Sequence, residues 1–349
     1  MSNRTLYICI LNNSRLMSTI RDPTPCAILE AGELLKAGDL VAFPTETVYG
    51  LGANALDELA VQKIFSTKGR PSDNPLIVHV PDIDSAHPLV ESIDTWSERL
   101  AANFWPGPLT IILPVRPDSG IAKTVTAGLS TVGIRVPDHP VALALLRAAR
   151  VPLAAPSANK SGSPSPTTAR HVFNDHGENG PRMILDGGSC RVGLESTVVE
   201  VRGDDVYILR PGGVTPEMIS EKIALSMDRI HMAFRMLESN ETPKAPGMKY
   251  RHYAPKAPVV PVMNHEDWTM IQLKESDVVI VFDTLNVVGG RRLSFGPGDV
   301  RIASERLFDL LRQTDEMNTS TVYIDCSFDH SDGLGHALWN RISKAAARK

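Results

Sequence analysis

The sequence predicts an α/β protein with two domains, in which a large mixed sheet precedes a smaller domain with a parallel sheet. Short apolar segments of strand length alternate with segments of helical periodicity along the chain. The length of 349 residues is about twice that of one compact domain. A proline-rich stretch without apolar periodicity, residues 238–258, separates two runs of this alternation.

The first domain is expected to cover residues 17–237, after an N-terminal extension of residues 1–16. Apolar residues at helical spacing predict helices at 26–36, 57–68, 96–104, 141–149, 168–176 and 215–224. Short, mainly apolar segments of three to six residues predict strands at 40–43, 76–80, 109–113, 131–136, 153–155, 183–185, 197–202 and 206–210. The turn Gly203-Asp204-Asp205 predicts antiparallel pairing of the last two strands, so we expect a mixed sheet.

The second domain is expected at residues 259–349, after a linker of residues 238–258. Strands at 259–262, 278–283 and 321–325 alternate with helices at 267–274, at 304–317 and from 336, which predicts a small parallel sheet. The linker carries cations and aromatic residues at 248–253, where a spacer would carry Gly and Ser. This composition is compatible with a lid over a site and equally with a proline-rich arm packed on either domain.

The composition excludes several classes of protein. Apolar residues make up 42% and charged residues 22%, which excludes wholesale disorder. The 36 Lys and Arg against 40 Asp and Glu give a net charge of -4, without the basic excess of a dedicated nucleic-acid binder. No apolar run approaches the roughly 18 residues of a membrane span. The four cysteines have no zinc-site spacing and no signal peptide is evident, so we expect a cytoplasmic protein without metal-ligating residues.

The loop from Pro44 to Gly50 follows the first predicted strand of the domain, where open α/β sheets place ligand-binding loops. Thr47 lies within it. The residues from Gly50 to Ala55 match a loose dinucleotide fingerprint, but they lie beyond the strand and outside a βαβ unit, which disfavours that function. No phosphate-binding glycine loop of the P-loop type is present. Lys and Arg side chains must therefore neutralise any bound phosphate.

Two cations lie at the end of the helix predicted at 57–68. Lys68 either complements the helix dipole ahead of Gly69 or binds phosphate. The loop from Arg70 to Asn74 contains a proline and presents a cation and a carboxamide directly before a strand. Rigid presentation of such groups favours phosphate recognition.

Polar side chains share one face of two predicted strands. Alternation places His79 opposite the apolar set of its strand, and places Thr131, Gly133 and Arg135 opposite the apolar set of theirs. An arginine within a strand must be solvated or paired, so this face either meets water or lines a concave anion site. Gly133 would leave room there for a ligand to approach closely.

Three more polar motifs occur next to predicted strands. They are Pro156-Ser157-Ala158-Asn159, Glu195-Ser196-Thr197 and Arg210-Pro211-Gly212. Each is a weak signal by itself, because Ser, Asn and Gly are common in turns. Their repetition at successive strand ends predicts a binding site along one edge of the sheet.

Taken together, six ordered motifs resemble the Sua5/YrdC/YwlC family, and in particular its two-domain Sua5 type. The motifs that carry this resemblance are residues 44–52, 68–70, 156–159, 195–197, 210–212 and 247–255. The resemblance implies an α/β fold with a YrdC-like first domain, whose twisted mixed sheet has a concave site, and a smaller Rossmann-like C-terminal Sua5 domain.

Members of this family are threonylcarbamoyl-AMP synthases, which join L-threonine, bicarbonate and ATP into threonylcarbamoyl-AMP and pyrophosphate, with Mg²⁺. The resemblance implies the same reaction here. It further implies that a separate threonylcarbamoyl transferase machinery uses the product to modify adenosine 37 of tRNA, and it leaves a weak direct tRNA contact open.

With that chemistry, each candidate residue receives an expected role. Lys68 and Arg70 are the expected catalytic groups, which offset charge on the phosphates. The expected ATP-binding residues are Lys68, Arg70, Asn74, Thr131, Ser157, Asn159, Arg210 and Tyr250. The expected threonine-binding residues are Thr47, His79, Arg135, Ser196 and Thr197, with Arg135 paired to a carboxylate.

Two other functions remain open from the residues. One is formation of carbamoyl-AMP in hydrogenase maturation, whose usual acylphosphatase module and zinc fingers have no counterpart in the sequence. The other is non-catalytic binding of double-stranded RNA on a concave sheet, which the balanced charge and an aromatic content of 5% disfavour.

Overall fold

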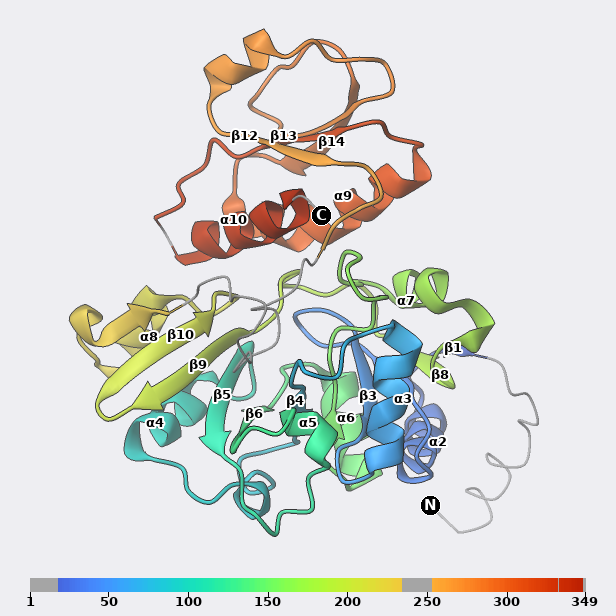
Figure 1. Ribbon diagram of the computed structural model, residues 1–349, viewed down its shortest axis with the longest axis vertical. Helices are drawn as coiled ribbons and strands as arrows, with labels where there is room; N and C mark the ends of the chain where they lie inside the picture. The colour runs from blue at the N-terminus through green and yellow to red at the C-terminus, as the bar shows by residue number, and fades with distance from the viewer. Residues whose placement is uncertain (1–17, 234–252, 332, 348–349) are drawn as a thin grey trace.

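The computed structural model describes residues 18–233, 253–331 and 333–347, which form two sheets (Figure 1). The N-terminal extension of residues 1–16, most of the linker and Tyr250 lie outside the described residues. The expected domain boundaries at residues 17 and 237 lie outside them as well. The division of the chain at those positions therefore stays a prediction.

The first sheet has eleven strands of mixed direction. The predicted hairpin is confirmed, because β9 pairs with β10 in antiparallel register, whereas β4 pairs with β6 in parallel. In spatial order the strands are β1 (Thr19–Arg21), β8 (Met183–Leu185), β2 (Val41–Phe43), β3 (Gly50–Asn54), β7 (Leu153–Ala154), β4 (Ile77–His79), β6 (Thr131–Arg135), β5 (Leu109–Pro114), β9 (Thr197–Arg202), β10 (Asp205–Arg210) and β11 (Ile230–Met232).

The helices of this domain begin and end where the sequence supplies caps. Asp57 accepts hydrogen bonds from two amides of α3, and Gly69 ends that helix with a φ of 62°. The helices are α2 (Pro25–Lys36), α3 (Glu58–Lys68), α4 (Thr95–Phe104), α5 (Lys123–Thr126), α6 (Pro140–Ala149), α7 (Ala169–His176) and α8 (Pro216–Ile223). Three short 3-10 helices are η1 (His87–Leu89), η2 (Gly177–Asn179) and η3 (Met227–Arg229).

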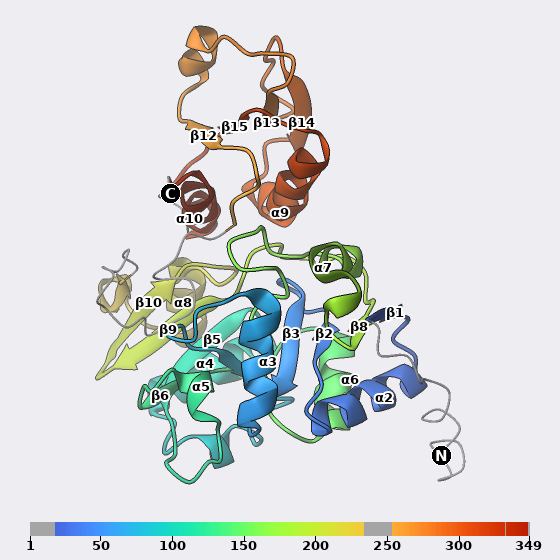
Figure 2. The same cartoon turned by 45° about the vertical axis from the view of Figure 1, so that its right-hand side comes forward.

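Alternating residues of β2 enter different cores, so the sheet is covered on both faces. Ala42 belongs to the core that also contains Ile64 of α3, whereas Val41 and Phe43 pack into the core with Leu145 of α6. Figures 1 and 2 show α3 on one side of these strands and α2 with α6 on the other. A strand buried on both faces explains the continuous apolar run that predicted it.

Several elements were not predicted. The glycine-rich segment expected to be a loop forms β3, which pairs with β2 in antiparallel register. Glycine is required within it because a Cβ at Gly52 would lie 2.9 Å from the ring of Phe43. The strands β1 and β11, at the ends of the sheet, and the single-turn helix α5 are too short to give a periodic pattern.

The C-terminal domain contains the expected parallel sheet. Its strands, in spatial order, are β12 (Val259–Val262), β15 (Val322–Asp325), β13 (Val278–Phe282) and β14 (Arg291–Gly296), and every pair is parallel. Two long helices, α9 (Val300–Glu316) and α10 (Gly333–Ala346), both lie on the face toward the first domain (Figures 1 and 2). A Rossmann-like arrangement, with helices on both faces, is therefore not confirmed. The helix expected at 267–274 is instead a 3-10 helix, η4 (His265–Met270).

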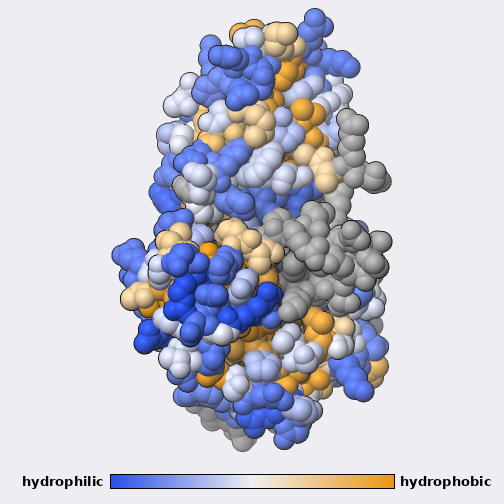
Figure 3. Space-filling model, turned by 60° about the vertical axis from the view of Figure 1, so that its left-hand side comes forward, coloured by the Kyte–Doolittle hydropathy of each residue, from blue (hydrophilic) through white to orange (hydrophobic). Residues whose placement is uncertain are grey.

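The two domains share buried contacts. Val48 and Leu194 of the first domain belong to one apolar cluster with Phe308 of α9 and Leu338 of α10. On the face drawn in Figure 3, hydrophilic and hydrophobic residues are interspersed, as is usual for protein surfaces. Within the described ranges, no helix has both the length and the apolar character needed to cross a membrane.

Candidate active site

A cavity opens where loops and strand ends of the first sheet meet the segment that precedes β12. Eight of the predicted site residues line it, as expected for a site along one edge of the sheet. Those eight are Thr47, Arg70, His79, Arg135, Ser157, Asn159, Ser196 and Arg210. The rest of the described lining is Thr45, Val48, Gly50, Ile77, Ala155, Pro156, Glu195 and Tyr253.

His79 and Arg135 are neighbours on the floor of the cavity, since they are register partners in the parallel pair β4 and β6. Both are nearly inaccessible to solvent, at 3% and 4% exposure. Burial, with a further contribution from the Arg135 charge, lowers the pKa of His79 to about 3. The imidazole is therefore neutral at physiological pH, and its Nδ1 has no hydrogen-bond partner among the described residues.

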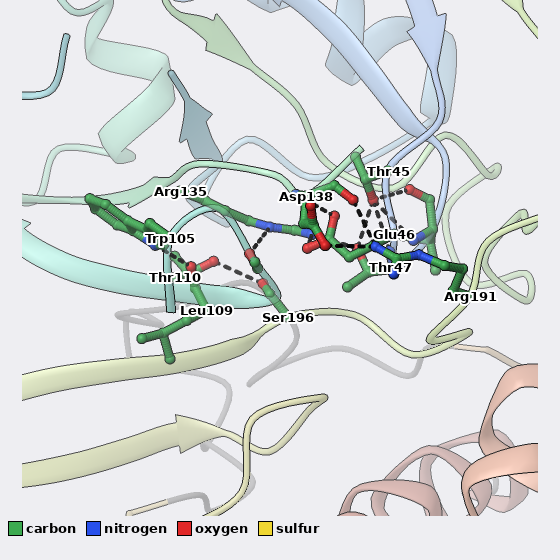
Figure 4. Close-up of polar contacts among 12 residues, drawn as sticks. Thr45, Glu46, Thr47, Trp105, Leu109, Thr110, Arg135, Asp138, Arg191 and Ser196 are labelled. Atoms are coloured by element: carbon green, nitrogen blue, oxygen red, sulfur yellow. Dashed lines mark hydrogen bonds and ion pairs between the residues drawn. The ribbon is translucent and has the colours of Figure 1, made fainter. Parts of the chain in front are cut away.

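Arg135 resolves the choice left open by its strand position: it is buried and paired. Its guanidinium donates to Glu46 Oε1 at 2.7 Å and to the Thr47 hydroxyl at 2.9 Å (Figure 4). The other Glu46 oxygen accepts the backbone N–H of Asp138 at 3.0 Å, and Asp138 pairs in turn with Arg191. Arg135 therefore lines the cavity while its guanidinium is already paired with the carboxylate of Glu46.

Gly133 does not provide the expected space for a ligand. A Cβ at this position would lie 3.1 Å from Thr110 and 3.3 Å from Ile112. Neighbouring side chains therefore fill the space above this glycine, and the interpretation that a ligand approaches there is wrong. The glycine instead permits close side-chain packing within the sheet.

Lys68 is buried behind the cavity and is not among the described lining residues. Its ammonium group donates to the backbone carbonyl of Ser157 and, at 2.5 Å, to that of Asn159. Burial and the nearby Arg70 charge hold its pKa well below the usual value for lysine. The structure thus places Lys68 as an anchor of the loop that carries two predicted nucleotide-binding residues.

Three other predicted residues are absent from the described lining. Asn74 is 1% exposed, and neither its Nδ2 nor its Oδ1 has a hydrogen-bond partner among the described residues. Thr131 lies four residues along β6 from Arg135, about 13 Å away at the rise of a strand. The Thr197 hydroxyl donates to the carbonyl of Val214 at 2.6 Å and accepts its N–H at 3.0 Å, so backbone groups occupy it.

The loop after β7 and the turn before β9 present polar atoms from two sides. Ser157 Oγ donates to Asn159 Oδ1 at 2.6 Å, which fixes the orientation of the carboxamide. Across the cavity, Arg210 donates to the Ser196 carbonyl at 3.0 and 2.9 Å and to its hydroxyl at 3.0 Å. Burial lowers the pKa of Arg210 to about 10, so the guanidinium remains charged at neutral pH.

Two functional candidates were missed although their motifs had been recognised. In the first motif Ser196 and Thr197 were predicted as site residues and Glu195 was not. In the second, Tyr250 was predicted and Tyr253 was not. Glu195 accepts from Ser165 at 2.5 Å and from Arg341 of α10 at 2.7 Å. One feature of the sequence could have indicated Glu195. It lies between two buried segments, and a carboxylate in such a position requires a cationic partner.

The cavity is built to bind anions. Three arginines, Arg70, Arg135 and Arg210, line it together with hydroxyl and amide groups, and its one carboxylate in the described lining is neutralised within the protein. Buried cations and oriented donors in a site of low dielectric interact strongly with phosphate and carboxylate groups. Such a site can bind anionic groups.

The described residues do not form a metal site of their own. No group of three or more His, Cys, Asp or Glu side chains in this part of the chain is arranged to hold a metal ion. Both oxygens of Glu195 are engaged by Ser165 and Arg341. The donor set around the cavity therefore does not fit a Mg²⁺ ion held by the protein.

Comparisons with known proteins agree with this architecture. The family model Sua5/YciO/YrdC, described as telomere recombination, matches residues 33–212. A second model, described as threonylcarbamoyl-AMP synthase, C-terminal domain, matches residues 214–347. The chain is 43% identical to threonylcarbamoyl-AMP synthase of Bacillus subtilis, covering 91% of this chain and 92% of the relative. It is also 43% identical to the enzyme of that name from Pyrococcus abyssi, over 90% and 93% of the two chains.

A solved structure has the same two-domain arrangement. Sua5 of P. abyssi in complex with L-threonine superposes with a TM-score of 0.83 at 39% identity, covering 95% of this chain and 97% of that one. These matches extend over both domains. The chain belongs to the Sua5/YciO/YrdC family and has the two-domain form that ends in a Sua5 C-terminal domain.

Proposed function

We propose that this protein is an L-threonylcarbamoyladenylate synthase, which forms threonylcarbamoyl-AMP and pyrophosphate from L-threonine, bicarbonate and ATP. The observation that carries the proposal is the convergence of Arg70, Arg135 and Arg210 with hydroxyl and amide groups on one cavity. The names of the similar proteins support the same reaction.

Threonine is assigned to the part of the cavity around Thr47, His79 and Arg135. The Arg135 guanidinium donates a hydrogen bond to the Thr47 hydroxyl. This arrangement supports binding of the threonine carboxylate by Arg135, beside Thr47. Ser196 completes this side, and Thr197 supports it through its bonds to Val214. The neutral His79 adds no positive charge beside the threonine amine.

ATP is assigned to the side formed by Arg70, Arg210 and the loop of Ser157 and Asn159. Lys68 fixes that loop through hydrogen bonds to two of its carbonyls. Within the described part of the chain the buried carboxamide of Asn74 has no hydrogen-bond partner, which supports a role in nucleotide binding because a buried amide that makes no hydrogen bond is costly. Thr131 and Tyr250 stay in the proposal as ATP-binding residues without further support from the contacts.

The chemistry requires orientation and charge neutralisation more than covalent help. The threonine amine, in its neutral form, attacks CO2 with release of a proton, or bicarbonate with loss of water, to give a carbamate. A carbamate oxygen then attacks the α-phosphorus as the bond to pyrophosphate breaks in line. Arg70 and Arg210 offset the charge that develops on the departing phosphates, and Arg135 holds the amino-acid carboxylate in place.

Mg²⁺ belongs to the proposal only as a counter-ion of the triphosphate that enters with ATP. Magnesium is usually bound by a few protein carboxylates together with substrate phosphates. No step above depends on it. We further propose that the protein acts in the cytoplasm and that a tRNA-modifying threonylcarbamoyl transferase consumes the product, with at most a weak direct contact to tRNA.

The decisive experiment measures pyrophosphate release from ATP with threonine and bicarbonate each omitted in turn. Release should require both. Arg70→Ala and Lys68→Ala should each lower turnover by about 100-fold or more, the scale for one preorganised charge-stabilising group. Arg99→Ala, which removes an exposed arginine of α4, is the matched control and should leave turnover unchanged.

Three outcomes would contradict the proposal. Pyrophosphate release that needs no threonine would favour a carbamoyl-AMP former. Salt-dependent RNA binding without nucleotide turnover would favour the RNA-binding alternative. Normal turnover in both variants would mean that Lys68 and Arg70 have only structural roles, at the end of α3 and in the loop of Ser157 and Asn159.

A further inference from the structure

Glu46 is a buried carboxylate at the junction of three segments of the chain. It is 1% exposed, and it precedes Thr47 in the loop between β2 and β3. Its Oε1 accepts from Arg135 at 2.7 Å, and its Oε2 accepts the backbone N–H of Asp138 at 3.0 Å. Its own backbone carbonyl accepts the N–H of Val192 at 2.8 Å. One residue therefore joins the loop after β2, the segment after β6 and the segment before β9.

The guanidinium of Arg135 is held by acceptors from more than one segment. Its Nη2 donates to Glu46 and, at 2.9 Å, to the Thr47 hydroxyl (Figure 4). Its Nε donates to the Gly107 carbonyl at 3.3 Å. These bonds use every N–H group of Nη2 and Nε, and Nη1 donates to none of the residues that the structure describes. Because Arg135 lines the cavity, this arrangement leaves Nη1 for a ligand.

The hydroxyl groups beside Arg135 are also fixed in direction. The Thr45 hydroxyl donates its only proton to the Val48 carbonyl at 2.6 Å. In the hydrogen bond of 2.8 Å between Thr45 and Thr47, the donor is therefore Thr47. The Thr47 hydroxyl thus accepts from Arg135 and cannot follow it if the guanidinium turns. Among the described residues, Glu46 is the one charged acceptor of Arg135.

We infer that Glu46 is a positioning residue of the active site: it holds the Arg135 guanidinium so that Nη1 meets the carboxylate of the bound amino acid. The inference rests on the proposed assignment of threonine to Arg135 and deepens it. A donor that is fixed before the ligand arrives does not have to be ordered on binding. Glu46 is absent from the described lining of the cavity, so it contributes to amino-acid affinity through Arg135.

The test separates the position of the Glu46 carboxylate from its charge. The dissociation constants of L-threonine and ATP are measured by equilibrium titration of the full-length protein, with thermal unfolding as a check of folding. Glu46→Asp keeps the charge but shortens the side chain, which draws the guanidinium out of place, so threonine binding should weaken by about 10-fold or more. ATP affinity should stay unchanged, because ATP is assigned to the other side of the cavity.

Glu46→Gln removes the charge but keeps an oxygen that accepts from Arg135. Threonine should therefore bind within about threefold of its normal affinity. The amide nitrogen cannot accept the Asp138 N–H, and that loss should lower the thermal unfolding midpoint without changing the affinity for ATP.

Arg191→Ala is the matched control at the same junction. Arg191 is 67% exposed and donates to the carbonyl of Asp138 at 3.0 Å and to its carboxylate at 2.7 Å. Its removal leaves the bonds between Glu46 and Arg135 in place. Threonine and ATP should bind to this variant with unchanged affinity.

A role of charge alone predicts the opposite pattern, with normal threonine binding in Glu46→Asp and altered binding in Glu46→Gln. That pattern would overturn the inference. Equal losses of threonine and ATP affinity in Glu46→Asp would overturn it too, because a general loosening of the first domain affects both ligands. If one of the two variants does not fold, the other decides by itself.

Arg135→Gln separates this inference from the proposed function. If it weakens threonine binding by about 10-fold or more while Glu46→Asp binds threonine normally, the inference fails and the assignment of threonine to Arg135 stands. If Arg135→Gln leaves threonine binding unchanged, the assignment itself is wrong and the inference falls with it.

Discussion

Two buried charges in the cavity wall are paired with an opposite charge inside the protein. Arg135 is paired with Glu46, and Glu195 with Arg341. A buried pair adds little net stability, but loss of one partner is strongly destabilising because the other charge remains buried. The pairs therefore hold the wall in one arrangement and determine how much positive charge remains for a ligand.

His79 should make the stability of the protein depend on pH in the acidic range. Its pKa is about 3 in the folded protein and 6.5 when unfolded, so only the unfolded state gains this proton between those values. The free energy of unfolding must then fall as pH is lowered below 6.5, by up to about 1.4 kcal/mol per pH unit. Urea unfolding of His79→Asn between pH 6.5 and 4 should show a shallower fall, and an unchanged slope would contradict burial of a neutral imidazole.

Gly133→Ala separates a packing role from a ligand-binding role. The added methyl group would press on Thr110 and Ile112, so the variant should lose about 1–3 kcal/mol of unfolding free energy. Threonine affinity of the folded variant should change little. A variant of normal stability that bound threonine tenfold more weakly would restore the idea that the ligand approaches this glycine.

Between elements, the docking of α9 on the first domain depends on one glycine. Gly193 has a φ of 73°, and a Cβ there would lie 2.3 Å from Glu305 Cα and 2.5 Å from the Ser304 carbonyl. The atoms that would clash with this Cβ belong to the backbone of α9, which cannot move aside as the end of a flexible side chain can. The turn that leads to Glu195 can therefore meet α9 only without a side chain.

Gly193→Ala should displace α9 and lower the thermal unfolding midpoint, because strain in the left-handed region adds to a backbone clash. A loss of at least about 2 kcal/mol is expected from these two effects. Gly203→Ala is the control: its φ is 61° and its hypothetical Cβ meets no neighbour, so only the backbone strain applies. Equal losses in both variants would contradict the tight approach of α9.

At the level of the whole molecule, the two domains form one structure in which the second completes the first. The apolar cluster of the C-terminal domain includes Leu194 and Val48, and Val48 also lines the cavity. The ion pair between Arg312 and Asp175, at 2.8 Å, adds a further polar contact across the interface. The first domain is therefore not expected to keep its full stability alone.

A chain that ends at residue 258 should be less stable than the first domain within the intact protein. Truncation would expose Val48 and Leu194, whose burial is worth about 1.5–3 kcal/mol each, and would leave Glu195 without Arg341. The thermal unfolding midpoint should fall by about 6 °C or more. A fragment with the midpoint and ATP affinity of the full chain would show that the interface supports neither fold nor site.

Local pattern was sufficient for the elements with strong periodicity. The bounds expected for α3, with Asp57 as its cap and Gly69 after it, agree with the structure. Edge strands such as β1, and the arginine-containing β14, were missed because partners that are distant in sequence stabilise them. The same limit applied to the site: Thr47 and Arg135 could be chosen from motifs, but Arg341 carries no local signal.

The sequence alone determined the α/β class, the parallel second sheet and the set of motifs that meet at one sheet edge, because caps, periodicity and short motifs act between near neighbours. Only the tertiary structure decided that Lys68 holds a loop, that Gly133 is packed over and that Glu195 is paired with Arg341 of the other domain. These three features depend on which side chains, distant in sequence, are packed together in the interior. In the interior, charges must be paired and the space is filled by side chains from other parts of the chain.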